Sequence, residues 1–361
     1  MFDDLRRRFR RFAEQPAPAE RPAVPLSAVQ LFERDMTASL DAGLLTGDDV
    51  IDAVHAYTQT HSEQHLQLVD PLVKARMMGV LSREIDALPE KDTAEDKAYY
   101  DSLVKTGQTL AVHTQVPENT VALYHKVVDK MVADVDAMAH RQSRQAGILD
   151  GQTPAEGADL KEAITFLNDM IAKRFDVRTG VSTVVVSDPA SKNRGMARWN
   201  EERAMFEVES NVADIKTVRD LPLLGIILAH EGVHHSLNQA NRNIPDPEKV
   251  LKHDPDLYTL LRVCDRNFYT SERQAVYRRH PEEILAHRIG MRFGLGLNDA
   301  LKSGLTRADF EPYANSFPDR RVYGELERVM PLQEKTLNEP VKGSGNKAPG
   351  RKGIFGRFIP G

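Results

Sequence analysis

Residues 220–238 read DLPLLGIILAHEGVHHSLN, and this stretch decides the fold and the chemistry expected of the chain. Asp220 is a suitable N-cap residue, and Pro222 falls in the first turn, where its missing N–H costs nothing. The segment from Leu223 to Ala229 is apolar nearly all round, which predicts a buried helix. The histidines that follow it are therefore expected at the edge of a hydrophobic core.

The end of this helix carries an HExxH pattern. His230 and His234 are four residues apart and share one helical face, so both imidazoles can reach one metal ion. Glu231 lies about 100° round the helix from His230, which suits a general base acting on a metal-bound water. Roughly 0.03 such patterns are expected by chance in this chain, so a metal site is favoured. Two histidines on an ordinary helix are the alternative interpretation.

A catalytic zinc ion takes three protein ligands and keeps a fourth position open, so a third ligand is expected downstream. The extended histidine motif is excluded, because Leu237 and Ala240 stand where it requires glycine and histidine. The best candidate lies in HPEEILAH at 280–287, where Pro281 predicts a first helical turn and Glu283 is the preferred ligand. An acid in a first turn is also favourable through the helix dipole alone. The alternatives from the same segment are Glu282, His280 and His287.

These two motifs give residues 155–300 a resemblance to the gluzincin class of zinc metallopeptidases. The shared features are a sheet whose last strand precedes an HExxH helix, and a second helix supplying glutamate from Pro-Glu-Glu-Ile-x-Ala. The chain is also loosely similar to ImmA/IrrE-like peptidases and to peptidase-like domains of bacterial mobile-element proteins. The resemblance implies Zn²⁺ bound by His230, His234 and Glu283. It further implies Glu231 as the general base and a protein or peptide as the substrate.

The resemblance leaves the roles of several neighbouring residues open. Gluzincins often place a small acceptor such as aspartate four residues after the ligand glutamate, whereas this chain has His287 there. His287 would orient Glu283, donate to the oxyanion or join the metal. Tyr277 and Arg288 are further candidates for the oxyanion, so Glu231, His287 and Tyr277 are the expected catalytic set. The strand over 204–209 would lie along the cleft and pair with an extended substrate.

The rest of the sequence predicts a mainly α chain of the α+β class. Residues 26–150 have the pattern of amphipathic helices in a bundle, one of which begins at Asp70 and Pro71. Stretches at 181–187, 196–199 and 204–209 predict a small antiparallel sheet before the HExxH helix. The expected parts are a basic amphipathic helix with a proline-rich linker (1–25), a helical domain (26–150), a zincin-like metallopeptidase domain with a helical C-terminal extension (151–341) and a flexible basic tail (342–361).

Charge is distributed unevenly along the chain. The net charge is −5, but residues 1–12 carry +3 and residues 342–361 carry +5, which leaves −13 for the body between them. An acidic body argues against nucleic-acid binding across it, and no specific nucleic-acid partner is expected. The basic ends carry aromatic residues and predict contact with a membrane surface or a partner protein, with plain solvated ends as the alternative.

Three features of composition narrow the class of protein further. The single cysteine, Cys264, excludes a disulfide within the chain and a cysteine-based zinc cluster. No apolar run reaches the roughly 18 residues of a membrane-spanning helix, and the N-terminus lacks the apolar core of a secretory signal. We expect a cytoplasmic zinc metallopeptidase, with peripheral membrane association or delivery by a dedicated secretion system as options. The alternative is a non-enzymatic structural or interaction protein of a phage, mobile element or secretion system that keeps a zinc-binding zincin-like fold.

Overall fold

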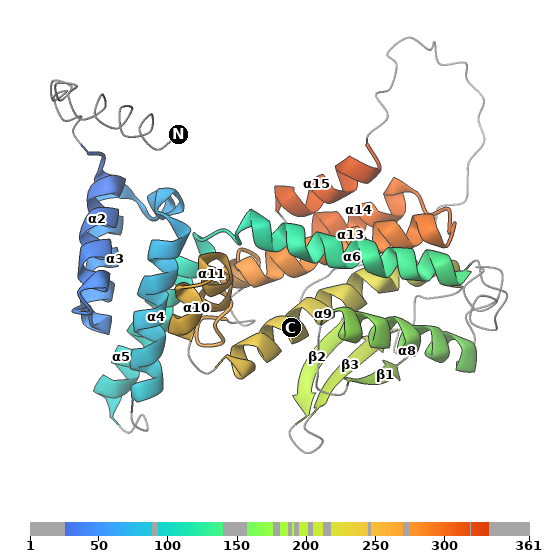
Figure 1. The fold of residues 1–361 in the computed structure, drawn as a ribbon, viewed down its shortest axis with the longest axis horizontal. Helices are drawn as coiled ribbons and strands as arrows, with labels where there is room; N and C mark the ends of the chain where they lie inside the picture. The colour runs from blue at the N-terminus through green and yellow to red at the C-terminus, as the bar shows by residue number, and fades with distance from the viewer. Residues whose placement is uncertain are drawn as a thin grey trace, which may run out of the picture.

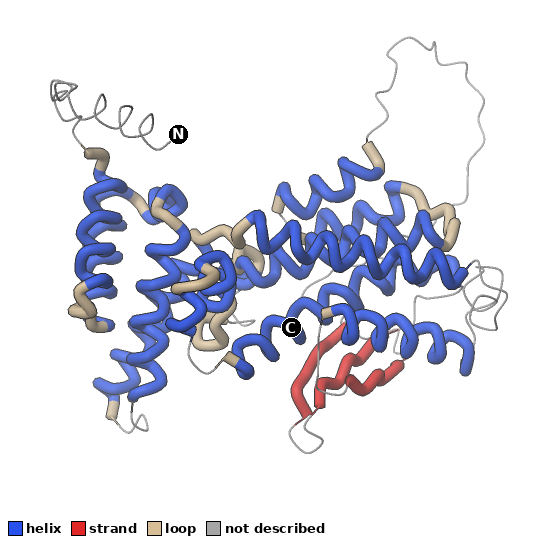
Figure 2. The backbone as a smooth tube through the Cα atoms, viewed as in Figure 1, coloured by secondary structure: helices blue, strands red, loops and turns tan. Residues whose placement is uncertain are grey.

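The computed structural model describes most of the body of the chain (Figures 1 and 2). The described residues are 26–88, 93–139, 157–175, 181–186, 190, 195–200, 205–211, 218–244, 247–269, 274–317 and 319–331. The predicted N-terminal helix with its linker (1–25) and the predicted basic tail (342–361) lie outside them, so both stay predictions.

The described residues are mainly helical, as the sequence predicts. The N-terminal helices are α2 (Ala28–Asp41), α3 (Gly47–His61), the 3₁₀ helix η1 (Glu63–Leu68), α4 (Pro71–Ala87), α5 (Ala94–Val112) and α6 (Glu118–Ala139). The later helices are α8 (Gly157–Arg174), η2 (Val218–Asp220), α9 (Leu221–Asn243), α10 (Pro247–Leu251), α11 (Pro255–Val263), α12 (Gln274–Tyr277), α13 (Pro281–Ala300), α14 (Arg307–Ser316) and α15 (Arg320–Val329). No described helix combines the length and the apolar character needed to cross a membrane.

Helices α9 and α13 begin where the sequence places them. Helix α9 follows directly on η2 and carries Pro222 in its first turn, which confirms the predicted HExxH helix. Asp220 holds the N-cap position, as predicted, although its side chain makes no capping hydrogen bond. Pro281 begins α13, and the Nδ1 atom of His280 accepts a hydrogen bond from the backbone N–H of Glu282 at 3.4 Å. His280 therefore caps α13.

A three-stranded sheet precedes α9, but its pairing differs from the predicted antiparallel arrangement. Its strands are β1 (Val181–Val186), β2 (Gly195–Asn200) and β3 (Met205–Asn211), in the spatial order β1-β3-β2. Strand β3 pairs antiparallel with β2 and parallel with β1. The predicted antiparallel pairing is confirmed for β2 with β3 and is wrong for β1, which is parallel to β3. A strand inserted between two strands of opposite direction must be parallel to one of them.

The order of the strands also corrects the expected position of a substrate. Strand β3 contains most of the predicted cleft strand 204–209, yet it lies in the middle of the sheet and is paired on both sides. Its backbone groups are used within the sheet, so it cannot add a substrate strand. Helix α9 packs on β2 and β3, and α8 packs on β1 (Figure 1). The sheet thus supports the helix that carries the HExxH pattern.

One hydrophobic cluster joins the N-terminal helices to the later ones. It contains buried residues from Val50 in α3 to Leu301 just after α13. Helix α6 packs along α13 and α4 packs on α11, and Figure 1 shows α6 running beside α13. Buried members of one cluster therefore lie on both sides of the predicted boundary at residue 151. The division into domains stays a prediction.

Candidate metal site

The site forms along the contact between α9 and α13. Two glycines of α13 make this contact possible, because neither position has room for a side chain. A Cβ atom on Gly290 would lie 2.4 Å from the backbone oxygen of Ile226 in α9, and one on Gly294 would lie 2.7 Å from the backbone oxygen of Pro222. Helices packed at such short range bring side chains of both into reach of one ion. The first turn of α13 thereby faces the last residues of the HExxH pattern.

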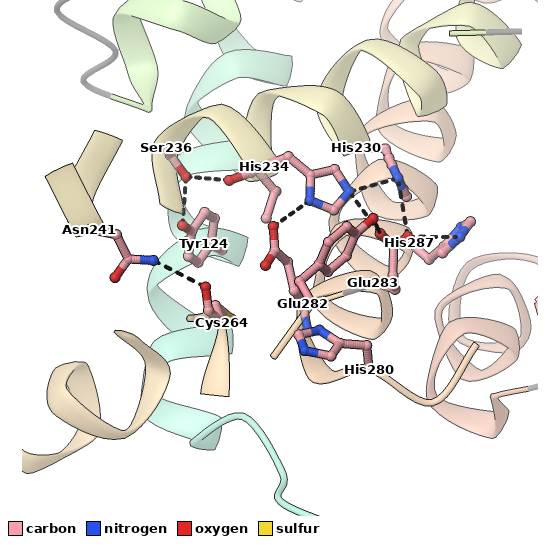
Figure 3. Close-up of polar contacts among 12 residues, drawn as sticks. Tyr124, His230, His234, Ser236, Asn241, Cys264, His280, Glu282, Glu283 and His287 are labelled. Carbon is pink, nitrogen blue, oxygen red and sulfur yellow. Dashed lines mark hydrogen bonds and ion pairs between the residues drawn. The ribbon is translucent and has the colours of Figure 1, made fainter. Parts of the chain in front are cut away.

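Three side chains meet at this seam, two from α9 and one from α13 (Figure 3). The Nε2 atoms of His230 and His234 are 3.1 Å apart. His234 Nε2 lies 3.3 Å from Glu283 Oε1, and His230 Nε2 lies 3.6 Å from Glu283 Oε2. Tetrahedral zinc with bonds of about 2.0–2.1 Å places its ligand atoms about 3.3 Å apart. One ligand atom from each of the three side chains lies within 4.8 Å of the other two, so the group can hold one metal ion.

Burial makes a negative charge on Glu283 costly in free energy. Glu283 is completely buried, and its Oε2 atom has no hydrogen-bond partner among the described residues. Burial raises the pKa of the Glu283 carboxyl, and the nearby charge of Glu282 adds to the effect, while His234 opposes it. A buried carboxylate oxygen without a donor costs free energy, which a bound cation offsets. The described residues thus contain a His-His-Glu group that can hold a metal ion.

Neighbouring side chains that contact His234 and Glu283 orient these two metal-ligand candidates. Glu282 reaches across the seam, and its Oε1 atom lies 2.6 Å from Nδ1 of His234, so Nε2 is the nitrogen that faces Glu283 (Figure 3). Burial alone lowers the pKa of His234, but the charges of Glu283 and Glu282 raise it to about 10. The hydroxyl of Tyr269 donates to Glu283 Oε1 at 2.8 Å. Tyr277 donates a further hydrogen bond to the same carboxylate.

The alternative third ligands of the first turn have other partners. Glu282 holds His234, and His280 caps the helix, so neither directs a donor atom into the His-His-Glu group. Arg288, a predicted oxyanion donor, lies 3.5 Å from Glu118 and 3.8 Å from Glu325. These ion pairs direct its guanidinium towards α6 and α15. Among the candidates of this turn, Glu283 is the one that the structure brings to the two histidines.

Replacing Glu282 by glutamine is expected to weaken zinc binding by roughly 10- to 100-fold, the usual cost of removing a partner that orients a metal-binding histidine. The amide no longer fixes which ring nitrogen of His234 carries the proton, and it removes a negative charge from the neighbourhood of the ion. Competition with a chromophoric chelator measures the change. The matched control is Glu327→Gln, an exposed position on α15. Equal zinc affinity for the Glu282 variant and the wild type would show that this contact has no orienting effect.

His287 lies beside the group but outside its three closest donors. Its Nε2 atom is 3.9 Å from Glu283 Oε2, and its ring centroid is 4.4 Å from that of His230. Its Nδ1 atom is 2.8 Å from the hydroxyl oxygen of Tyr313. Burial lowers the pKa of His287 to about 3, and the charge of His234 adds to this, so the ring is neutral. His287 is thus placed to hydrogen-bond to a molecule that binds beside Glu283.

Glu231, the expected general base, is half-buried one position after His230 on α9. Burial and the charge of Glu283 raise the pKa values of the Tyr277 and Tyr313 hydroxyls, and Glu231 contributes to both shifts. The charge of Glu231 also raises the pKa of His234, so Glu231 acts on several groups of the site. Tyr277, an expected oxyanion donor, already donates to Glu283.

Two tyrosines beside the metal-ligand candidates were missed in the sequence. Tyr269 lies in the segment between α11 and α12, and Tyr313 lies on α14. Neither belongs to a motif with metal-ligand spacing, so only the folded chain shows that they reach the site. Comparison with known proteins returned no match to a protein-family model, to a curated protein or to a solved structure. The zinc interpretation thus rests on the His-His-Glu group itself.

Proposed function

We propose that this chain is a zinc-dependent hydrolase with a zincin-like fold, and that its substrate is a peptide bond. The observation that carries the proposal is the meeting of His230, His234 and Glu283, each of which offers one ligand atom within 4.8 Å of the other two. Three protein donors leave one position for water or substrate, whereas structural zinc sites are usually closed by four. Glu231 next to the first ligand favours catalysis, since a structural ion has no use for a base.

Zinc, when bound, lowers the pKa of water towards neutrality and polarises a carbonyl group. The chain supplies the remaining parts of the reaction. His230, His234 and Glu283 hold the ion, and Glu231 takes the proton released by the attacking water and returns it to the leaving nitrogen. His287, neutral and directed towards the Glu283 side, hydrogen-bonds to the carbonyl oxygen of the substrate as negative charge develops there.

A peptide as the substrate is supported by the resemblance to gluzincins and by the sheet beside α9. Strand β2 pairs with β3 on one side only within the described residues, and it also packs against α9. An extended peptide can add to such an edge through main-chain hydrogen bonds. In this proposal the edge of β2 binds the substrate, a role that the sequence assigned to residues 204–209. Most of those residues belong to β3, the central strand.

Zinc content and peptide cleavage of the wild type test the proposal together. The full chain is loaded with zinc, dialysed and analysed for metal, and a mixture of unstructured peptides is followed by mass spectrometry. One zinc per chain and cleavage that chelation abolishes are expected. Stoichiometric zinc without cleavage would favour the non-enzymatic zinc-binding protein instead. A chain that retains no zinc would contradict both.

A further inference from the structure

A short turn after α11 contacts both the N-terminal helices and the candidate metal site. We name it the 265–268 turn after its residues, Asp265 to Phe268. The backbone N–H of Phe268 donates to the carbonyl oxygen of Asp265 at 3.0 Å, which closes the turn. The side chain of Asp265 accepts from the backbone N–H of Asn267, also at 3.0 Å. The turn therefore has a defined conformation of its own.

Helix α4 holds the polar side of the 265–268 turn. The hydroxyl of Ser82 donates to Asp265 Oδ2 at 2.7 Å. The side-chain amide of Asn267 donates to Ser82 Oγ at 3.2 Å and to Asp86 Oδ1 at 3.3 Å. Ser82 is nearly completely buried, so loss of its contact would leave a buried polar group without its partner. Two residues of α4 thus fix two residues of the turn.

Helix α5 holds the apolar side of the turn. Phe268 is completely buried and its ring rests on the backbone of α5 at Gly107. A Cβ atom on Gly107 would lie 2.1 Å from Cδ1 and 2.2 Å from Cε1 of that ring. Atoms cannot approach so closely, so a side chain at position 107 must displace the ring of Phe268. Glycine at this position is required by the contact and not by helix formation, which glycine disfavours.

The residue that follows Phe268 reaches the metal site. The hydroxyl of Tyr269 donates to Oε1 of Glu283 at 2.8 Å, while Oε2 has no hydrogen-bond partner among the described residues. The ring of Tyr269 lies against that of His280, with centroids 5.3 Å apart. The hydrogen bond occupies one carboxylate oxygen and leaves the other for a cation. The position of Tyr269 depends on Phe268, because the two residues are adjacent in the chain.

We infer that helices α4 and α5 set the affinity of the metal site by holding the 265–268 turn, and through it the hydrogen bond from Tyr269 to Glu283. Tyr269 is a positioning residue, because it acts on the ion only through Glu283. The N-terminal helices thereby have a role in metal binding, although none of the three donors comes from them. This inference deepens the proposed function and rests on its metal site.

A double-mutant cycle tests the coupling between Gly107 and Tyr269. Zinc affinity is measured by chelator competition for the wild type, Gly107→Ala, Tyr269→Phe and the double variant. Tyr269→Phe is expected to weaken binding roughly 10- to 100-fold, as for other partners of metal ligands. Gly107→Ala is expected to weaken it at least fivefold in the wild type and less than twofold in the Tyr269→Phe background. Equal losses in both backgrounds, or no loss at all, would overturn the inference.

Two further variants separate this coupling from a general loss of stability. Gly324→Ala is the matched control, because a Cβ atom at that position on α15 meets nothing within 4 Å. It is expected to leave zinc affinity unchanged. Ser82→Ala removes the hydrogen bonds of Ser82 to Asp265 and Asn267 without adding an atom, and serves if Gly107→Ala does not fold. Ser82→Ala is expected to weaken zinc binding in the wild type and not in the Tyr269→Phe background.

A measurement on the metal-free protein tests whether the turn controls Tyr269, independently of whether the chain binds zinc. The chain is labelled with 3-fluorotyrosine, and the ¹⁹F resonance of Tyr269 is assigned by its loss in Tyr269→Phe. In the metal-free protein, Gly107→Ala and Ser82→Ala are expected to shift this resonance, and Gly324→Ala is not. An unmoved resonance in both would show that the turn does not control Tyr269, whether or not the wild type binds zinc. A shifted resonance in a protein that binds no zinc would contradict the metal site and the proposed function, and would leave only the control of Tyr269 by the turn standing.

Discussion

Glu231→Gln is expected to lower kcat by about 10²- to 10⁴-fold, the usual contribution of a general base, and to leave zinc bound. The amide has nearly the shape of the carboxylate, but it cannot accept the proton of the attacking water. Glu231 lies outside the His-His-Glu group, so its replacement does not remove a donor to the ion. Peptide cleavage under saturating substrate gives kcat, and metal analysis of the same sample gives the zinc content.

The control for this variant is Glu327→Gln, which makes the same chemical change at an exposed position of α15. Full activity is expected for the control. A pH–rate profile provides a second check, because the acidic limb belongs to the group that must be deprotonated for catalysis. That limb should disappear in whatever activity remains in Glu231→Gln. Undiminished cleavage by Glu231→Gln would show that another group is the base.

Glu283→Gln is expected to cause the largest loss of zinc affinity, more than the roughly 100-fold upper limit for a partner that only orients a ligand. Glutamine has nearly the volume of glutamate and still accepts hydrogen bonds from Tyr269 and Tyr277, but its neutral oxygen is a weaker ligand. The variant also removes a buried charge, so no loss of fold is expected from the replacement itself. Chelator competition gives the affinity, and thermal unfolding without metal checks the fold.

His230→Ala provides the comparison from the other helix. It removes a donor of α9 while Glu283 is unchanged, and the same large loss of zinc is expected, because both residues bind one ion. Stoichiometric zinc that survives Glu283→Gln would show that another residue is the third ligand. His287 would then be the first to examine, because its Nε2 atom lies 3.9 Å from the carboxylate.

The sequence predicts the parts of the site that are local in the chain. HExxH spacing on a buried helix places His230 and His234 on one face, and the structure has them with facing nitrogens. The choice between Glu282 and Glu283 as the third ligand depends on how α13 packs against α9. The two are neighbours in the first turn of α13 and point about 100° apart, so the one facing α9 is decided by how the helices pack. Glu283 was the preferred candidate of the two, and the structure buries it completely.

The sequence could not predict features that depend on distant contacts. The strand lengths and positions follow from local pattern, but the insertion of β3 between β1 and β2 depends on which strands meet, and no local pattern records that. Tyr269 contacts Glu283 and directly follows Phe268, whose ring rests on Gly107, more than 150 residues earlier in the chain. A glycine within the predicted helical region 26–150 gives no sign of such a contact.

Gly290 and Gly294 keep α9 and α13 together by the fit of backbone against backbone, which does not involve the ion. Small domains such as zinc fingers are unfolded until they bind their metal, so that removing the ion removes the structure. Here the seam between the two helices belongs to a core that is complete without it. Chelation should therefore yield a folded apoprotein, and returning zinc should need no refolding. Zinc at 100 times its Kd would then stabilise the chain by about 2.7 kcal/mol through mass action alone.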